Sequence, residues 1–90
     1  MRLDKFLKIT QIIKRRTMAN EAADEGFIKV NGKPAKPALK IKAGDCLEID
    51  MWNYYKKITV VALPPKGSVA KSDLEKYITL VEYKTKEPEF

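Results

Sequence analysis

The spacing of the apolar residues changes at residue 26, from a helical period to a β period, and this change limits the possible folds more than any other feature. Before it, Leu3, Phe6 and Leu7 recur at intervals of three and four residues, which predicts an amphipathic helix. After it, apolar and polar residues alternate over residues 46–51, which predicts a half-buried strand. A chain of 90 residues has room for one small core. We therefore expect an α+β fold, with two short N-terminal helices packed on a small twisted antiparallel sheet.

A basic turn, Lys14-Arg15-Arg16, joins the first predicted helix to a second one. Thr17 is expected to cap the start of the second helix, and Gly26 is expected to end it in the left-handed conformation. The residues expected on its apolar side are Met18, Ala19, Ala22 and Ala23. The basic turn therefore lies where its side chains and the unpaired N–H groups of the helix start can meet a phosphate together.

Short strands and tight turns are predicted for residues 27–63. Asn31-Gly32 is typical of a tight turn, because both residue types tolerate a positive φ. Two prolines in the basic segment 33–37 argue against a regular central strand. Asp45 is interpreted as a turn residue whose carboxylate accepts a hydrogen bond from the backbone that follows it. A further strand is expected over residues 58–63.

We place a domain boundary after residue 63, with residues 64–90 as a short C-terminal extension. Ser72 and Glu75 have the spacing of a capping box, which predicts a short helix that starts at Ser72. Residues 77–81 are rich in β-branched and aromatic side chains, and either a continued helix or a final strand fits them. Residues 84–90 are expected to form a frayed tail.

The positive charge of the chain belongs to its first half. The chain has 18 basic and 12 acidic residues, which give a net charge of +6. Residues 1–42 carry 11 basic and 4 acidic groups, whereas residues 43–90 carry 7 and 8. A charge concentrated in this way favours a face for a polyanion such as a nucleic acid. The alternative is a solvated basic surface that has no partner.

The composition excludes several kinds of catalytic and metal site. There is no histidine, which excludes imidazole catalysis and histidine-ligated metals. Cys46 is the single cysteine and is interpreted as a structural or surface thiol, so neither an internal disulfide nor a paired-cysteine metal site is expected. The N-terminus lacks the apolar stretch of a signal peptide, and no apolar run is long enough to span a membrane. We expect no cofactor and a reducing, cytoplasmic environment.

Three aromatic residues near the middle of the chain have two possible roles. Trp52, Tyr54 and Tyr55 could stack on unpaired bases of a nucleic acid. They could equally cover a small core, and we favour the core for them.

Four blocks of residues, with matching spacing between them, resemble the S-four RNA-binding domain, a family named after a small-subunit ribosomal protein. The blocks are Arg2-Leu3-Asp4-Lys5-Phe6-Leu7, Lys14-Arg15-Arg16-Thr17, Gly26-Phe27-Ile28-Lys29-Val30-Asn31-Gly32 and Gly44-Asp45. The resemblance covers roughly residues 1–50 and implies the arrangement of helices and sheet known as the alpha-L RNA-binding motif. It also implies that residues 1–63 form the RNA-binding domain.

Within that superfamily the chain is most similar to the RqcP family of bacterial ribosome-associated quality-control factors. The resemblance implies a factor without catalysis that binds a large ribosomal subunit blocked by an unreleased nascent chain. The implied partners are ribosomal RNA, the peptidyl-tRNA in the P site and an RqcH-type alanine-tailing factor, and a monomer is expected off the ribosome. A related small heat-shock protein implies the alternative, which is the recycling of free large subunits that carry a nascent chain. The short C-terminal segment without excess charge favours the RqcP type.

Carried over residue by residue, the resemblance implies that Arg2 and Arg16 contact RNA phosphates. Arginine suits such positions because its planar guanidinium can hold two phosphate oxygens at once. Asp4 matches the family pattern but cannot bind a phosphate, so we expect it to orient a neighbouring Arg or Lys through a charge-assisted hydrogen bond. The full predicted RNA-binding set is Arg2, Lys5, Lys14, Arg15, Arg16, Lys33 and Lys36.

Two other functions fit the sequence less well. S-four domains are often fused to pseudouridine synthase or methyltransferase domains, but the ~40 residues that follow residue 50 are too few for such a domain. Two short helices also suggest a DNA-binding helix-turn-helix protein. The second helix, however, carries Glu21, Asp24 and Glu25, which would be repelled in a major groove.

Overall fold

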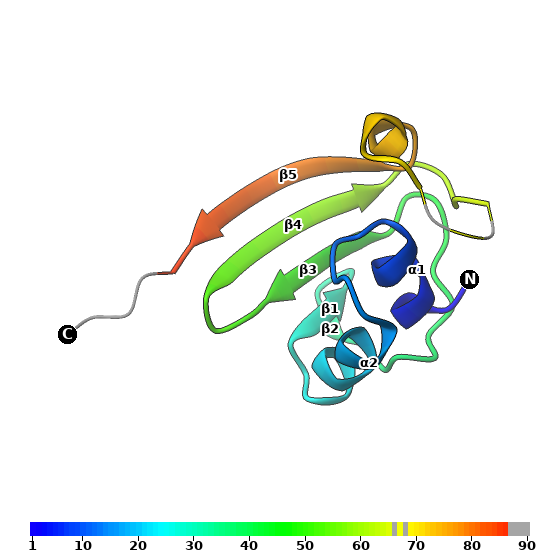
Figure 1. Cartoon of the computed structure of the whole chain (residues 1–90). Helices are drawn as coiled ribbons and strands as arrows, with labels where there is room; N and C mark the ends of the chain where they lie inside the picture. Colours follow the sequence, from blue (N-terminus) through cyan, green and yellow to red (C-terminus); the bar gives the residue numbers. More distant parts are fainter. Residues whose placement is uncertain (66, 68, 87–90) are drawn as a thin grey trace.

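Two helices lie against one face of a five-stranded antiparallel sheet (Figure 1). The structure is a computed structural model, and it describes residues 1–65, 67 and 69–86. The strands follow the order β2-β1-β3-β4-β5 across the sheet. The elements are α1 (Leu3–Ile9), α2 (Arg16–Asp24), β1 (Ile28–Val30), β2 (Lys33–Pro34), β3 (Cys46–Asp50), β4 (Tyr54–Val60), the 3-10 helix η1 (Lys71–Lys76) and β5 (Ile78–Thr85). The predicted α+β fold class is confirmed.

The core lies between the helices and the sheet. Leu3, Phe6 and Leu7 are fully buried, as their helical spacing predicts, and they pack with the inward residues of β1, β3 and β4. The small residues Ala19, Ala22 and Ala23 on α2 are also buried. Met18, which was expected on the same apolar side, is 52% exposed, so that expectation is wrong.

Helix α2 ends close to the predicted place, whereas α1 ends earlier than a helix that runs up to Lys14, and α2 does not use the predicted cap. Helix α1 ends at Ile9, and Gln11 then adopts a φ of 61°, which turns the chain toward α2. Helix α2 begins at Arg16 with Arg15 as its N-cap and no side-chain cap bond, so the expected Thr17 cap is wrong. Gly26 has a φ of 87° after the end of α2, which confirms its predicted role.

The hairpin of β1 and β2 forms where Asn31-Gly32 predicted it. Both residues have positive φ values, 53° and 84°, which fit a tight two-residue turn. The side chain of Asn31 also ties this turn to β3: its amide nitrogen donates to Asp45 (3.1 Å), and its amide oxygen accepts from the backbone N–H of Cys46 (2.9 Å). The Asp45 carboxylate accepts from the backbone N–H of Lys42 (2.9 Å), which precedes it. Asp45 therefore holds a turn as expected, but from the preceding backbone rather than the following one.

The outward face of the sheet carries charges of alternating sign. The strand register places Lys29 opposite Glu48, Glu48 opposite Lys57, and Lys57 opposite Glu82. Cross-strand neighbours of opposite sign stabilise a solvated sheet face modestly. The Tyr55 hydroxyl donates to Glu48 (2.8 Å), and this hydrogen bond is the main cause that raises the pKa of Tyr55 to about 12. This face therefore balances its own charges and leaves the excess positive charge elsewhere.

The C-terminal segment completes the sheet. For residues 77–81 the sequence allowed either a helix or a strand. From Ile78 onward they belong to β5, which pairs along the whole of β4. A short 3-10 helix precedes it, but its N-cap is Ala70 and it has no side-chain cap bond, so the capping box at Ser72 is wrong. Of the expected frayed tail, residues 84 and 85 belong to β5, and residues 87–90 lie outside the described residues.

The aromatic residues near the middle of the chain are only partly buried, although we favoured the core for them. Trp52, for which we favoured the core, is 79% exposed in the turn between β3 and β4. Tyr54 does pack against the core, and its ring stacks on Tyr83 at 6.2 Å between centroids. The strand expected over residues 58–63 instead starts at Tyr54 and ends at Val60.

Candidate nucleic-acid interface

A buried carboxylate organises the positive side chains where α1 and α2 meet. Asp4 is 2% exposed, although it sits in the first turn of a helix at the surface. Arg2 donates to both of its oxygens through Nε and Nη2, each at 3.2 Å. Arg16 places Nε 3.5 Å from Oδ2, and Asn20 donates to the same oxygen at 3.3 Å. We call Arg2, Asp4, Arg16 and Asn20 the Asp4 cluster.

The Asp4 carboxylate is held in its charged form. Burial alone raises the pKa of a carboxyl group, but the hydrogen bond from Asn20, the charge of Arg16, the backbone N–H of Lys5 and the charge of Arg2 together outweigh it. The net result is a pKa of Asp4 below its ordinary value of 3.8. The expectation that Asp4 orients a neighbouring arginine is met by this geometry, and it orients two.

The two arginines of the Asp4 cluster keep their outer surfaces free. The side chains of Arg2 and Arg16 are 46% and 50% exposed. They border a shallow hollow of about 420 Å³ with Thr17, Asn20 and Glu21. Because each guanidinium has five N–H donors, a pair with Asp4 leaves others available for a phosphate.

A second hollow next to Arg16 has three cations among the described residues that line it. Lys5, Lys8 and Arg16 border it, together with Ile9 and Gly67. Lys5 and Lys8 lie one helical turn apart on α1, so they face the same side. Lys8 was not in the predicted set, although its spacing from Lys5 was a signal that could have found it.

Lysines from β2 and the loop after it form a separate groove. Lys33, Lys36, Lys40 and Lys42 line a hollow of about 740 Å³, together with apolar residues such as Ala35 and Leu39 and the acid Asp45; we call this the lysine groove. It adjoins the Asp4 cluster, because Arg2 and Lys40 form an isolated β-bridge and Leu3 N–H donates to the Leu39 carbonyl at 2.8 Å. Lys40 had no sequence signal, since only the folded loop brings it beside Arg2.

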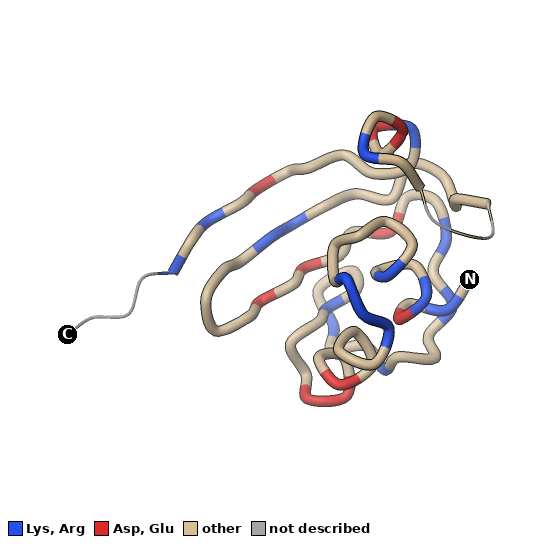
Figure 2. The backbone as a smooth tube through the Cα atoms, in the orientation of Figure 1, with Lys and Arg blue, Asp and Glu red and all other residues tan. Residues whose placement is uncertain are grey.

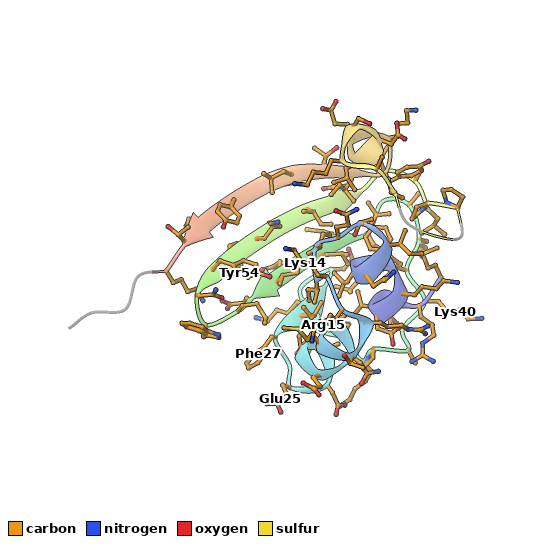
Figure 3. The ribbon with its side chains drawn as sticks, in the orientation of Figure 1. Lys14, Arg15, Glu25, Phe27, Lys40 and Tyr54 are labelled. Carbon is orange, nitrogen blue, oxygen red and sulfur yellow. The ribbon has the colours of Figure 1, made fainter. Side chains whose placement is uncertain are left out.

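The structure thus groups the predicted RNA-binding residues unevenly. Arg2 and Arg16 meet at Asp4, and Lys5 lies beside Arg16. Lys33 and Lys36 line the lysine groove, where Lys36 also approaches Asp24 at 3.7 Å. Lys14 and Arg15 are exposed in the loop between the helices and line none of these three hollows; Figure 3 labels both on that loop, with Lys40 on the side of the N-terminus.

The excess of positive charge lies around α1, the loop between the helices and the segment beside the N-terminus. In Figure 2, Lys and Arg follow α1, the loop between the helices and the segment beside the N-terminus, while Asp and Glu gather at the end of α2 and along β3. Within the described ranges, no cluster of Cys, Asp and Glu could hold a metal ion. In the same ranges, no helix is long and apolar enough to cross a membrane.

Comparison with known proteins identifies the class first. The model of the S4 domain family matches residues 1–46, which contain α1, α2, the β1–β2 hairpin and the loop that carries Lys40. The fold and the match together define an S4-domain protein, the class that the four sequence blocks predicted.

Full-length relatives narrow this class to one family. A Halalkalibacterium halodurans protein is 46% identical over 88 residues, which cover 98% of this chain and 94% of that protein. A Streptococcus pneumoniae protein is 51% identical over 81% of both chains, and a Bacillus subtilis protein is 40% identical over 91% of this chain and 93% of its own. All three are named RQC P-site tRNA stabilizing factor. The chain belongs to this family, which confirms the predicted resemblance.

Two solved structures have the same fold. The solution structure of the hypothetical protein HP1423 is 33% identical, with a TM-score of 0.76, and the match covers 97% of this chain and all of that one. Heat shock protein 15 of Vibrio cholerae gives a TM-score of 0.79 at 21% identity, over 90% of this chain and 81% of that one. At that identity the second likeness concerns the fold alone.

Proposed function

We propose that this protein binds a large ribosomal subunit obstructed by an unreleased nascent chain and stabilises the tRNA in the P site. In this proposal the Asp4 cluster and the lysine groove contact phosphates of ribosomal RNA and tRNA. The protein then supports C-terminal alanine tailing by an RqcH-type factor, and it does so without catalysis. Membership of the family named RQC P-site tRNA stabilizing factor supports the role.

The observation that carries the proposal is the buried Asp4 with its two arginines. A surface cation that merely keeps a protein soluble needs no fixed orientation. Arg2 precedes α1 as its N-cap and Arg16 is the first residue of α2, yet both are fixed on one carboxylate, within one 420 Å³ hollow. Fixed guanidinium groups lose little rotamer entropy on binding, so they suit recognition of phosphates at defined positions.

The proposed mechanism is a shift of population rather than a reaction. Structured RNA has a major groove too deep and narrow for side chains, so its phosphates and its shape are what a small rigid surface contacts. Contacts that exist only when tRNA occupies the P site stabilise that state relative to the state without it. In this proposal the Asp4 cluster and the lysine groove supply such contacts at the same time.

The test is sedimentation of bacterial lysate on a sucrose gradient, with the wild type and two variants. Arg16→Ala removes one arm of the Asp4 cluster. Lys29→Ala is the matched control, because it removes the same charge from the outward sheet face, where Lys29 stands opposite Glu48. We expect the wild type and Lys29→Ala in large-subunit fractions that also contain peptidyl-tRNA and RqcH, and Arg16→Ala at the top.

Other outcomes would replace the proposal. Wild type on large subunits regardless of RqcH and peptidyl-tRNA would favour the recycling of free subunits. Equal loss of both variants would show that only total charge matters. Wild type at the top of the gradient at low salt would contradict ribosome binding altogether.

A further inference from the structure

An apolar hollow lies along α2 on the side of Phe27 and Met51, and Glu21 is the residue that it shares with the hollow beside Arg2 and Arg16. It is lined by Met18, Glu21 and Ala22 of α2 and by Glu25, the C-cap of that helix, with Phe27 and Met51 from the chain beside it, and we call it the apolar hollow. Phe27 and Met51 are brought together because the backbone N–H of Asp50 donates to the Phe27 carbonyl at 2.9 Å. Figure 3 shows Glu25 and Phe27 projecting outward at this end of the molecule.

Helix α2 presents two different faces. Arg16 and Asn20, four residues apart, point to Asp4. Met18, Glu21, Ala22 and Glu25 recur at intervals of three, four and seven residues, so they form a second stripe along the helix, which meets the first at Glu21. The stripe is apolar in its centre and acidic on its edge, which is unusual for a chain whose first half is strongly basic.

Two large side chains of the apolar hollow are exposed where a folded domain would ordinarily bury them. Met18 is 52% exposed and Phe27 is 40% exposed. Methionine and phenylalanine are enriched at protein interfaces, whereas charged residues are depleted at their centres. The hollow measures about 190 Å³, below the roughly 300 Å³ at which pockets for small ligands begin. It therefore suits one anchoring side chain rather than a cofactor.

Glu21 and Glu25 determine the charge of the occupant. They are the charged residues that line the hollow, and neither has an ion-pair partner within the described part of the chain. Two carboxylates repel the phosphates of RNA and attract lysine or arginine. We propose that the apolar hollow docks a basic protein segment, with one large apolar side chain in the hollow and Lys or Arg beside Glu21 and Glu25.

This interaction does not rest on the proposed function, although Glu21 also borders the hollow beside Arg2 and Arg16. The probe is a ten-residue synthetic peptide that alternates lysine with leucine and phenylalanine, added to the isotope-labelled full chain and followed by NMR. We expect the backbone amide signals of Ala22, Phe27 and Met51 to shift. Two control peptides are expected to leave these signals in place: one with glutamate for lysine, and one with serine for the apolar residues.

Matched variants of the chain give the quantitative test. Glu25→Lys is expected to weaken binding of the basic peptide about fivefold, because it replaces an attraction at the rim with a repulsion. Met18→Ser is expected to weaken it by a similar factor through lost apolar burial. Glu75→Lys makes the same charge change on η1 and should leave the affinity unchanged.

The proposal would be overturned by three results. The first is no shift of the three amide signals at millimolar peptide, and the second is equal binding of the serine peptide. The third is a shift of the same signals by a single-stranded RNA oligonucleotide, which would make the hollow an RNA contact. Arg16→Ala should keep peptide binding while losing ribosomal subunits, so failure of either proposal is seen separately.

Discussion

At the scale of single residues, Asp4 has more influence on the basic surface than any cation in it. It contributes a negative charge, yet it fixes Arg2 and Arg16 and accepts from Asn20 and from the backbone N–H of Lys5. Removal of this charge makes the protein more positive, which by itself strengthens attraction to RNA. Loss of orientation has the opposite effect, so the two contributions can be separated by experiment.

We predict that Asp4→Asn weakens binding to large ribosomal subunits about tenfold, although the net charge rises. Each of the two arginines then has to be immobilised on binding, at a cost of roughly 0.5–1.5 kcal/mol per side chain. Filter binding at fixed salt measures the change. Glu75→Gln adds the same charge on η1 and should not weaken binding. Tighter binding of Asp4→Asn would show that charge, and not orientation, governs the affinity.

The lowered pKa of Asp4 also predicts how stability depends on pH. The folded pKa lies below 3.8 and the unfolded pKa is about 3.9, so the folded state favours the charged form. The stabilisation is therefore complete above about pH 4 and is lost as the pH falls through the lower folded value. Urea unfolding of the wild type and Asp4→Asn should show a constant difference near neutral pH that shrinks below about pH 4. A difference that persists unchanged at lower pH would contradict this cause.

At the scale of elements, the β1–β2 hairpin depends on Asn31 in two ways. Its φ of 53° favours Asn or Gly, and its side chain bonds Asp45 and the N–H of Cys46. We predict that Asn31→Ala lowers the free energy of unfolding by about 2–3 kcal/mol, because it adds backbone strain and removes both hydrogen bonds. Asn31→Gly removes the bonds without the strain and should cost about 1 kcal/mol.

Urea unfolding of the two Asn31 variants measures both contributions. Equal losses for Ala and Gly would mean that the left-handed backbone adds nothing to the effect. The lysine groove provides a second measurement, because Asn31 and Asp45 line it with Lys33 and Lys42. Both variants should therefore weaken RNA binding, although Asn31 is not part of the Asp4 cluster.

The local sequence pattern was sufficient to predict some helices, strands and turns, but not others. The spacing of Leu3, Phe6 and Leu7 and the Asn31-Gly32 pair predicted their structures because neighbours in sequence decide them. The Thr17 cap failed because Arg16 is already in the first turn of α2, where it meets Asp4. Residues 77–81 could not be assigned from sequence alone, since their strand exists through pairing with β4, more than fifteen residues earlier.

In the candidate site, too, the sequence predicted some residues and missed others. Arg2, Asp4 and Arg16 were found through a motif, and Asp4 was expected to orient a neighbouring Arg or Lys, but the meeting of both arginines at Asp4 was not predicted. Asn20 and Lys40 were missed because their roles arise from contacts between α1, α2 and the loop after β2, which no local pattern encodes. Trp52 was misplaced because an aromatic residue in a short turn is buried only where another element covers it.

At the scale of the whole molecule, charge is sorted by surface. The outward sheet face pairs Lys29, Glu48, Lys57 and Glu82 across four strands. The helices and the lysine groove hold the unbalanced cations, and the apolar hollow holds unbalanced carboxylates. Under the two proposals, the unbalanced cations contact RNA and the apolar hollow contacts a basic protein segment.

This sorting predicts the salt dependence of binding. Each phosphate contact contributes about −0.7 to −0.9 to the slope of log affinity against log salt, so about five contacts should give a slope near −4. Arg16→Ala removes one contact and should make the slope less steep by about 1. Lys29→Ala removes the same charge from a face whose cations stand opposite acids, so its slope should match the wild type.

Filter binding to purified large subunits from about 50 to 200 mM salt measures these slopes. The comparison of Arg16→Ala with Lys29→Ala is the informative one, because both variants have the same net charge. If the two slopes changed equally, binding would depend on the total charge of the molecule, and the separation of its surfaces would have no functional consequence. If only Arg16→Ala changed the slope, the counterions released on binding would come from phosphates that face the helices, where the Asp4 cluster fixes its arginines.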